Sequence, residues 1–80
     1  MKREKVKQVS KRLKEQLKEL DAKDTASQEK LSSVLNRVDA QEHHGLVDQI
    51  EEAAIFFEVK HPSIAAVLNE LKLILISLGA

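Results

Sequence analysis

The sequence predicts an all-α protein, a small four-helix bundle whose last two helices form an antiparallel hairpin. Apolar residues recur at spacings of three and four along most of the chain, which is the period of an amphipathic helix and not of a strand. The chain has 80 residues with only two Gly and one Pro, so few positions interrupt helices. This length is enough for a single domain, residues 1–80.

The first helix is expected over residues 1–22, and it is basic. Residues 1–20 contain eight Lys or Arg and three Asp or Glu, an excess of five positive charges. Its apolar residues fall within about 80° of the helix circumference, a stripe as narrow as a coiled-coil seam. This stripe consists of Val6, Val9, Leu13, Leu17 and Leu20.

The second helix is expected over residues 26–38, after a polar break from Asp21 to Thr25. Thr25 followed three residues later by Gln28 is typical of a capping box, in which hydroxyl and amide satisfy free backbone donors. The predicted core face consists of Leu31, Val34, Leu35 and Val38.

The third helix is expected over residues 42–59, with its start somewhere between Ala40 and Leu46. Asp39 followed by Glu42 favours an early start, whereas Gly45 weakens that start by about 1 kcal/mol. The predicted core face consists of Leu46, Val47, Ile50, Ala53, Ala54 and Phe57.

The fourth helix is expected over residues 62–78, and its start is the best-defined boundary in the sequence. Pro62 disfavours a helical conformation at His61 but suits the first position of a helix. Gly79 is typical of a helix end. The last two helices therefore form the hairpin about His61-Pro62. The predicted core face consists of Ile64, Val67, Leu68, Leu71, Ile74, Leu75 and Leu78.

The hairpin also carries a recognisable motif. The stretch Phe57-Glu58-Val59-Lys60-His61-Pro62, followed by an apolar helix ending at Leu78-Gly79-Ala80, resembles a family of short bacterial proteins known as domain of unknown function 4404. The likeness is clearest over residues 46–80, and the motif it shares is Phe-Glu-x-x-His-Pro. The first helix is more basic here, and Ala80 replaces the usual terminal Ile. The resemblance implies a small helical protein with no assigned activity.

Two histidines invite a test for a metal site. His44 and Asp48 are four residues apart, a spacing that can place two ligands on one helix face, but the adjacent His43 points about 100° away. A closed site needs about four ligands, and the sequence has no Cys. We therefore expect no metal and no cofactor.

The third histidine, His61, belongs to the motif with Phe57, Glu58, Pro62 and Gly79. We expect a structural corner, in which the ring caps the fourth helix or packs against the end of the third, with Glu58 orienting it. Acid–base catalysis would need a cleft and a second reacting group, and the sequence contains no nucleophile motif. We expect no enzyme activity and no small-molecule substrate.

A lysine stripe on the first helix is a candidate anion-binding surface. Lys7, Lys11, Lys14 and Lys18 fall within about 60° of one another and could contact the phosphates of nucleic acid or an anionic membrane. The helix has no aromatic residue to stack on bases or anchor in lipid. The stripe could equally be solvated or face acidic residues of the same chain or a copy, namely Glu42, Asp48, Glu51 and Glu52.

The last two helices carry more apolar residues than their core faces need. The surplus residues point away from those faces, and soluble monomers rarely expose patches of several hundred Å². We expect them to line a contact between copies, most simply a two-fold dimer. The predicted contact residues are Ile55, Phe56, Val59, Leu73 and Ile76.

These observations predict a non-enzymatic structural or interaction protein that works through helix–helix self-association as a homo-oligomer. The alternative is a binding module that presents the lysine stripe to nucleic acid or a membrane surface. The chain has no Cys, no signal-peptide pattern and no apolar run of about 18 residues, so the expected location is the cytoplasm.

Overall fold

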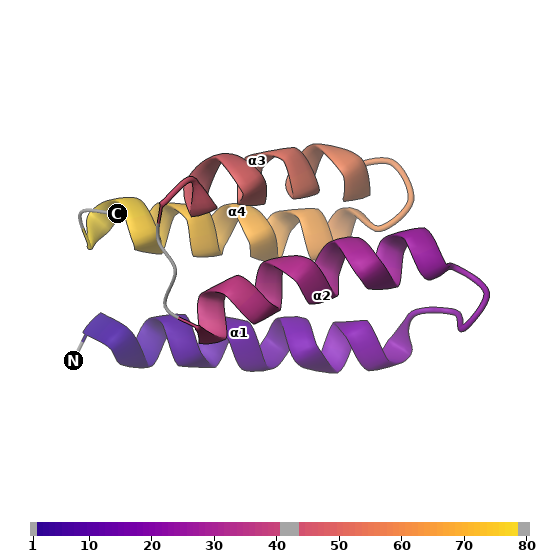
Figure 1. Ribbon diagram of the computed structural model, residues 1–80, viewed down its shortest axis with the longest axis horizontal. Helices are drawn as coiled ribbons and strands as arrows, with labels where there is room; N and C mark the ends of the chain where they lie inside the picture. Colours follow the sequence, from indigo (N-terminus) through magenta and orange to yellow (C-terminus); the bar gives the residue numbers. More distant parts are fainter. Residues whose placement is uncertain (1, 41–43, 79–80) are drawn as a thin grey trace.

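Four helices run alternately in opposite directions along the length of the molecule (Figure 1). The computed structural model describes residues 2–40 and 44–78. Within these ranges the helices are α1 (Lys2–Glu19), α2 (Thr25–Asp39), α3 (Leu46–Phe57) and α4 (Pro62–Ser77). The predicted all-α class, the helix count over these ranges and the antiparallel α3–α4 hairpin are confirmed.

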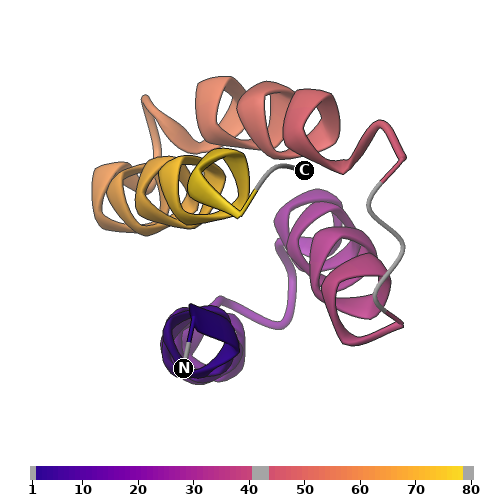
Figure 2. The ribbon, with the colours of Figure 1, turned by 90° about the vertical axis from the view of Figure 1, so that its left-hand side faces the viewer.

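The four helices are arranged in a ring (Figure 2). Each helix packs against its neighbour in sequence, and α1 closes the ring by packing against α4; the backbones of the diagonal pairs α1–α3 and α2–α4 do not approach each other closely. The α1–α2 pair therefore packs on the hairpin instead of leaving α1 free to reach a neighbour. The bundle is elongated, 36 × 19 × 19 Å. Along one of its sides, only α4 and α1 lie at the surface (Figure 2).

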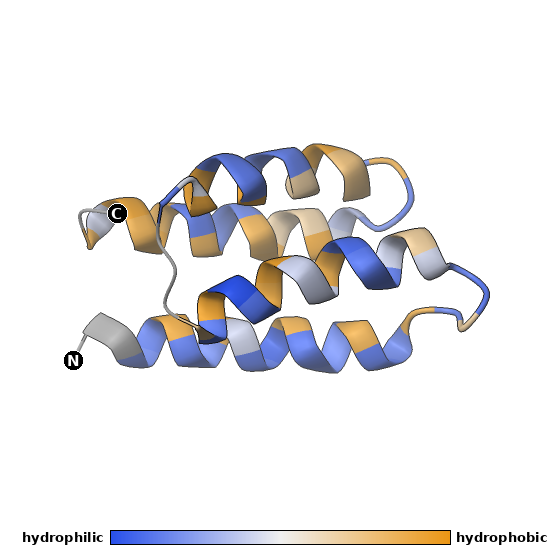
Figure 3. Ribbon diagram, in the orientation of Figure 1, coloured by the Kyte–Doolittle hydropathy of each residue, from blue (hydrophilic) through white to orange (hydrophobic). Residues whose placement is uncertain are grey.

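A single core occupies the middle of the ring. The predicted core faces of α2, α3 and α4 point into it, and α1 contributes a narrow apolar band facing the bundle, with polar residues along its outer side (Figure 3). Val6, Leu17, Val47 and Ile74 are only partly buried at its edge, and Leu78 of the predicted α4 core face lies outside it and lines the groove between α1 and α4. Ala65 of α4 is buried as well. The fully buried large side chains include Leu13, Leu31, Leu46, Ile50, Phe57, Leu68, Leu71 and Leu75.

The connection between α1 and α2 differs from the prediction. α1 ends at Glu19 and not at residue 22, because the carboxylate of Asp21 accepts a hydrogen bond from the Lys23 amide and folds the chain into a turn. α2 begins at Thr25, and its N-cap is Asp24, whose carboxylate accepts from the Ser27 amide. The predicted Thr25 capping box is therefore wrong. Gln28 does reach backwards, but it donates to the carbonyl of Asp21.

α3 is shorter than the predicted 42–59. It begins at Leu46 because Gly45 has a φ of 71°, a left-handed conformation that suits glycine and stops an earlier helical start. It ends at Phe57 and not at Val59, where the chain turns towards Pro62, and the Phe57 carbonyl accepts from the His61 amide at 2.8 Å. α4 starts at Pro62 as predicted and ends at Ser77, one residue early.

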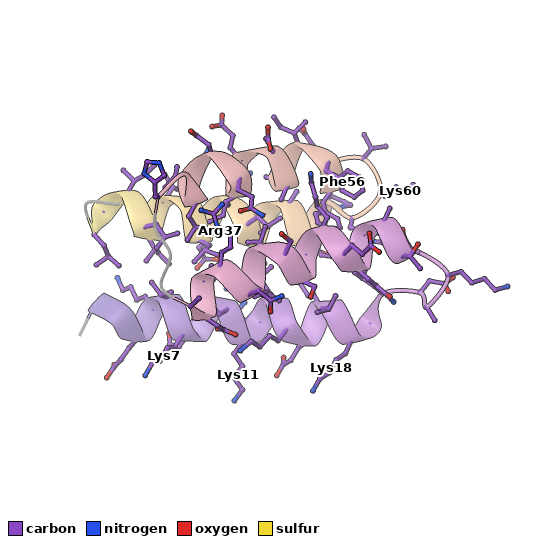
Figure 4. All side chains as sticks on the ribbon, in the orientation of Figure 1. Lys7, Lys11, Lys18, Arg37, Phe56 and Lys60 are labelled. Atoms are coloured by element: carbon purple, nitrogen blue, oxygen red, sulfur yellow. The ribbon has the colours of Figure 1, made fainter. Side chains whose placement is uncertain are left out.

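A polar cluster that the sequence analysis missed joins α2 to α3. The half-buried Arg37 donates to the side chain of Gln49 on α3 and to the carbonyl of His44 in the connection (Figure 4). Gln49 donates in turn to the hydroxyl of Ser33, 3.0 Å away. These bonds fix the start of α3 against the last turns of α2.

The difference between buried and exposed sides of α3 gives the first prediction. Ile50→Ala should lower the free energy of unfolding by about 2–5 kcal/mol, because Ile50 is fully buried and its removal leaves a cavity. Ile55→Ala, the same change on the exposed side of the same helix, should cost less than about 0.5 kcal/mol. Urea unfolding followed by circular dichroism measures both. Equal losses would contradict the orientation of α3.

Candidate interaction surface

Among the side chains that the structure describes, five large apolar ones are exposed on the bundle. Their exposed fractions are 64% for Ile55, 43% for Phe56, 89% for Val59, 63% for Leu73 and 51% for Ile76. These are the residues that the sequence analysis expected to lie off the core faces, and the packing of α1 against α4 covers neither Leu73 nor Ile76. Their role in a contact between chains remains a prediction.

The structure does not gather the five into one patch. Phe56 lies on the α2 side of α3, where its ring packs edge-on against Phe57 and the Lys30 ammonium of α2 lies 5.7 Å from its centroid (Figure 4). Ile55 lines a shallow groove between α3 and α4. Leu73 lines a different groove, between α1 and α4. A single flat contact therefore cannot cover the whole set.

The exposed side of α4 is almost free of charge. Among the sixteen residues of α4 only Glu70 and Lys72 are charged, and Glu70 forms an ion pair with Arg12 of α1 at 3.1 Å. Next to it, the α1–α4 groove has a volume of about 750 Å³, with Val9 and Ile74 at its base. The exposed residues of α4 are Pro62, Ser63, Ala66, Asn69, Glu70, Leu73, Ile76 and Ser77.

The exposed side of α3 is acidic. Ile55 and Val59 lie among four exposed carboxylates, and residues 45–59 contain no Lys or Arg. In the parts of the chain that the structure describes, none of these carboxylates forms an ion pair. This surface therefore suits contact with water better than burial against an apolar partner. The four acidic residues are Asp48, Glu51, Glu52 and Glu58.

The lysine stripe of α1 is only partly free. Lys7, Lys11 and Lys18 extend away from the bundle, and no carboxylate among residues 4–40 and 44–78 pairs with them (Figure 4). Lys14 instead forms an ion pair with Asp39 at the end of α2, at 3.0 Å. The remaining lysine of the predicted stripe, Lys14, thus joins α1 to α2.

His61 is held by residues of two other helices. It is the N-cap residue of α4, but its side chain makes no capping hydrogen bond, so the predicted ring cap is wrong. The ring packs on Phe57 at the end of α3, with centroids 5.9 Å apart, which agrees with the other predicted arrangement. Its Nε2 lies 3.4 Å from a carboxylate oxygen of Asp24, and no contact with the predicted partner Glu58 is seen. Gly79 of the motif lies outside the described residues.

The Asp24 carboxylate therefore joins the starts of α2 and α4. Hydrogen bonding from Ser27, then from His61, and the positive charge of Lys60 hold the pKa of Asp24 below its ordinary value of 3.8, although partial burial opposes them. The sequence analysis did not consider Asp24, because Thr25 and Gln28 matched a capping box. The sequence does contain a signal for this cap, because an Asp directly precedes Thr25 and Asp is at least as favourable as Thr at the N-cap position.

His44 and Asp48, whose spacing could place two ligands on one helix face, do not lie on the same helix. His44 precedes α3 in a turn, and its carbonyl accepts from Arg37. His43 lies outside the described residues. Across residues 2–40 and 44–78, no three His, Asp or Glu side chains come together as metal ligands. Over the same ranges, no helix has the length and apolar character needed to cross a bilayer.

Comparison with known proteins identifies one family. A model of the family described as "Domain of unknown function (DUF4404)" matches residues 3–80, which is nearly the whole chain. The resemblance carried by the Phe-Glu-x-x-His-Pro motif is thereby confirmed and extends to α1 and α2. No curated protein and no solved structure matches the chain. The family description names no activity.

The Asp24 contacts predict how stability depends on acid. Because the pKa of Asp24 is lowered by folding, its charge stabilises the fold above pH 3.8, and this contribution is lost as the pH falls through the pKa of the folded state. Asp24→Asn keeps a capping side chain without the charge. It should melt several degrees below the wild type at neutral pH, and the difference should shrink below pH 3.8.

Thermal melts by circular dichroism at a series of pH values measure this effect. Asp48→Asn removes an exposed carboxylate with no ion-pair partner among the described residues, and its melting curve should follow the wild type at every pH. An Asp24→Asn variant that also does so would contradict the role of Asp24.

Proposed function

We propose that this chain, which belongs to the DUF4404 family, is a non-enzymatic interaction module that pairs with a second copy of itself through the exposed side of α4. The observation that supports the proposal is the exposure of Leu73 and Ile76 on a helix side with almost no charge. In water these side chains leave apolar area unburied, and association recovers roughly 25 cal/mol per Å² of that area before the entropic cost of binding.

The charges of the surface favour α4 over α3 as the contact. A contact between two copies through the outer side of α3 would bring together the four carboxylates around Ile55, beside which Lys72 lines the adjoining groove, and this excess of like charge disfavours association. A contact through α4 involves Glu70, which Arg12 already neutralises, and Lys72, which is half-buried. Ile55, Phe56 and Val59 then lie beside the contact and not at its centre.

The overall charge also suits pairing with a copy. The chain carries 13 basic and 13 acidic residues, so two copies do not repel each other through their net charge. The exposed area on α4 is small compared with obligate dimer interfaces, so the expected dissociation constant is of micromolar order.

The surroundings of His61 support a structural role and not catalysis. Its ring is held between Phe57 and the Asp24 carboxylate, and that same carboxylate also caps α2. Both contacts hold the starts of α2 and α4 against the end of α3, which is the structural corner that the motif predicts.

Sedimentation equilibrium at micromolar concentration tests self-association. The wild type should sediment as a dimer of the 9.0 kDa chain. Leu73→Glu should weaken the dimer at least about tenfold, because it places two carboxylates in the contact. Ile55→Glu is a matched control, since Ile55 is 64% exposed and Leu73 is 63% exposed. It should leave the mass unchanged. A wild-type monomer, or a Leu73→Glu dimer of normal affinity, rejects the proposal.

The second candidate function is anion binding, and one observation favours it. Lys7, Lys11 and Lys18 project from one side of α1 without an acidic partner among the described residues (Figure 4). Three lysines can contact phosphates, but α1 has no aromatic residue to add to them, so they supply only a weak, salt-sensitive attraction. We therefore rank nucleic acid and anionic membranes below self-association.

A salt titration separates the two functions. Binding of the wild type to a fluorescent DNA duplex or to anionic vesicles should be detectable at low salt and disappear near physiological ionic strength. The triple change Lys7→Gln, Lys11→Gln and Lys18→Gln should remove it and leave the dimer intact. Binding that persists at physiological salt would instead favour the anion-binding module.

A further inference from the structure

We infer that two copies pair with their α4 helices antiparallel, about a two-fold axis that passes between the two helices, perpendicular to them, at the level of Leu71. The inference rests on the proposed function and adds the direction and register of the contact. It comes from a second seam on α4, from the sizes of the side chains in that seam, and from the charges on the neighbouring flank of α1.

The second seam lies on the side of α4 opposite the core. Its residues are separated by four, three, four and three positions, the spacing of coiled-coil core positions, and at 100° per residue they fall within about 80°. All of them are exposed, although positions with this spacing normally pack against another helix. The seam consists of Pro62, Ala66, Asn69, Leu73 and Ile76.

The sizes of the seam residues favour the antiparallel direction. The seam residues near the start of α4 have small side chains, and those near its end have large ones. Core residues of a coiled coil alternate between two positions along each helix. In an antiparallel pair, a residue at one position lies opposite a residue at the other position of the partner helix, so Ile76 faces Ala66 and Leu73 faces Asn69. Each layer then combines one large aliphatic side chain with one smaller residue. The distance between the helices can stay constant, with no void at either end.

The parallel direction packs less evenly. It would place each seam residue opposite its own copy, so an Ala66–Ala66 layer would lie one heptad from a Leu73–Leu73 layer. The helices would have to splay, or a gap would remain at Ala66, and such gaps are destabilising. The parallel pair does gain an Asn69–Asn69 amide contact, but Asn69 is exposed and already hydrated.

The flank of α1 beside α4 carries charges that also favour the antiparallel direction. Lys5, Arg12 and Glu19 are seven residues apart, so they share one side of α1, and the first two line the α1–α4 groove. The Arg12–Glu70 ion pair places Arg12 close to the level of the axis. A half-turn about that axis brings Lys5 of one copy near Glu19 of the other, twice in each dimer.

The charges of a parallel pair are mixed. The ring order places α1 and α3 on the two sides of α4, so a parallel two-fold would set α1 of one copy beside α3 of the other. Lys5 and Arg12 would then lie beside the acidic start of α3, but Glu15 and Glu19 at the end of α1 would approach Glu58, where like charges disfavour association. The sizes of the seam residues therefore decide the direction.

Single-cysteine variants test the direction, since the chain contains no Cys. Ala66→Cys and Ile76→Cys are purified separately, mixed in equal amounts in a glutathione redox buffer and analysed on a non-reducing gel. The antiparallel pair predicts a disulfide-linked dimer in the mixture and none with either variant alone. Residue 66 of one chain then lies about 15 Å, measured along the helix, from residue 66 of the other chain, which is too far for a disulfide.

The outcomes separate this inference from the proposed function. If each variant forms a linked dimer alone, the helices are parallel, and the inference fails while self-association stands. If the wild type sediments as a dimer but the mixture forms no linked dimer, the contact lies elsewhere and the inference fails. If the wild type sediments as a monomer, both fail.

Charge reversal gives a second test that involves no seam residue. Lys5→Glu should weaken the dimer about three- to tenfold, and adding Glu19→Lys should restore it. Lys7→Glu makes the same charge change away from this flank and should leave the dimer affinity unchanged. Equal weakening by Lys5→Glu and Lys7→Glu, or no recovery in the double variant, would overturn the predicted contact between the α1 helices.

Discussion

The organisation of this protein depends on one constraint, which is that α4 is apolar on two opposite sides while a four-helix ring can bury only one. Its inner side supplies Leu68, Leu71 and Leu75 to the core, all fully buried. Its outer side carries Leu73 and Ile76. α1 adds little cover, because its own apolar stripe is narrow and is used entirely against the core. The four-helix ring therefore buries a full core but leaves apolar side chains of α4 exposed to water.

The charges follow the same division. α1 carries most of the basic residues and α3 is acidic, and these two helices are diagonal partners whose backbones do not approach each other. Their charges therefore do not neutralise each other within one chain. Two ion pairs link ring neighbours instead, Arg12–Glu70 joining α1 to α4 and Lys14–Asp39 joining α1 to α2. Both pairs are about half exposed, so they fix orientation more than they add stability.

Much of the architecture could be predicted from the sequence, because helical period and proline placement act locally. The apolar spacing identified the core faces and the exposed surplus, and Pro62 fixed the hairpin. The helix ends were less predictable. Asp24 and Thr25 could each cap α2, and Asp24, which does so, also contacts His61, 37 residues away, a pairing that no local pattern indicates. Likewise, Lys14 could not be separated from its stripe until α2 brought Asp39 beside it.

The second seam of α4 lies where the pairing of two copies would also stabilise the fold of each copy. The α1–α2 pair and the α3–α4 hairpin meet along two lines, α2 against α3 and α1 against α4. The first is joined by the chain and by the Arg37–Gln49 contact. The second has no covalent link and an open groove along part of its length. A partner seated on α4 and the adjoining flank of α1 would bridge this second line in both copies. Free energy gained in pairing would thus hold the ring closed, so in a chain this short association and folding stabilise each other.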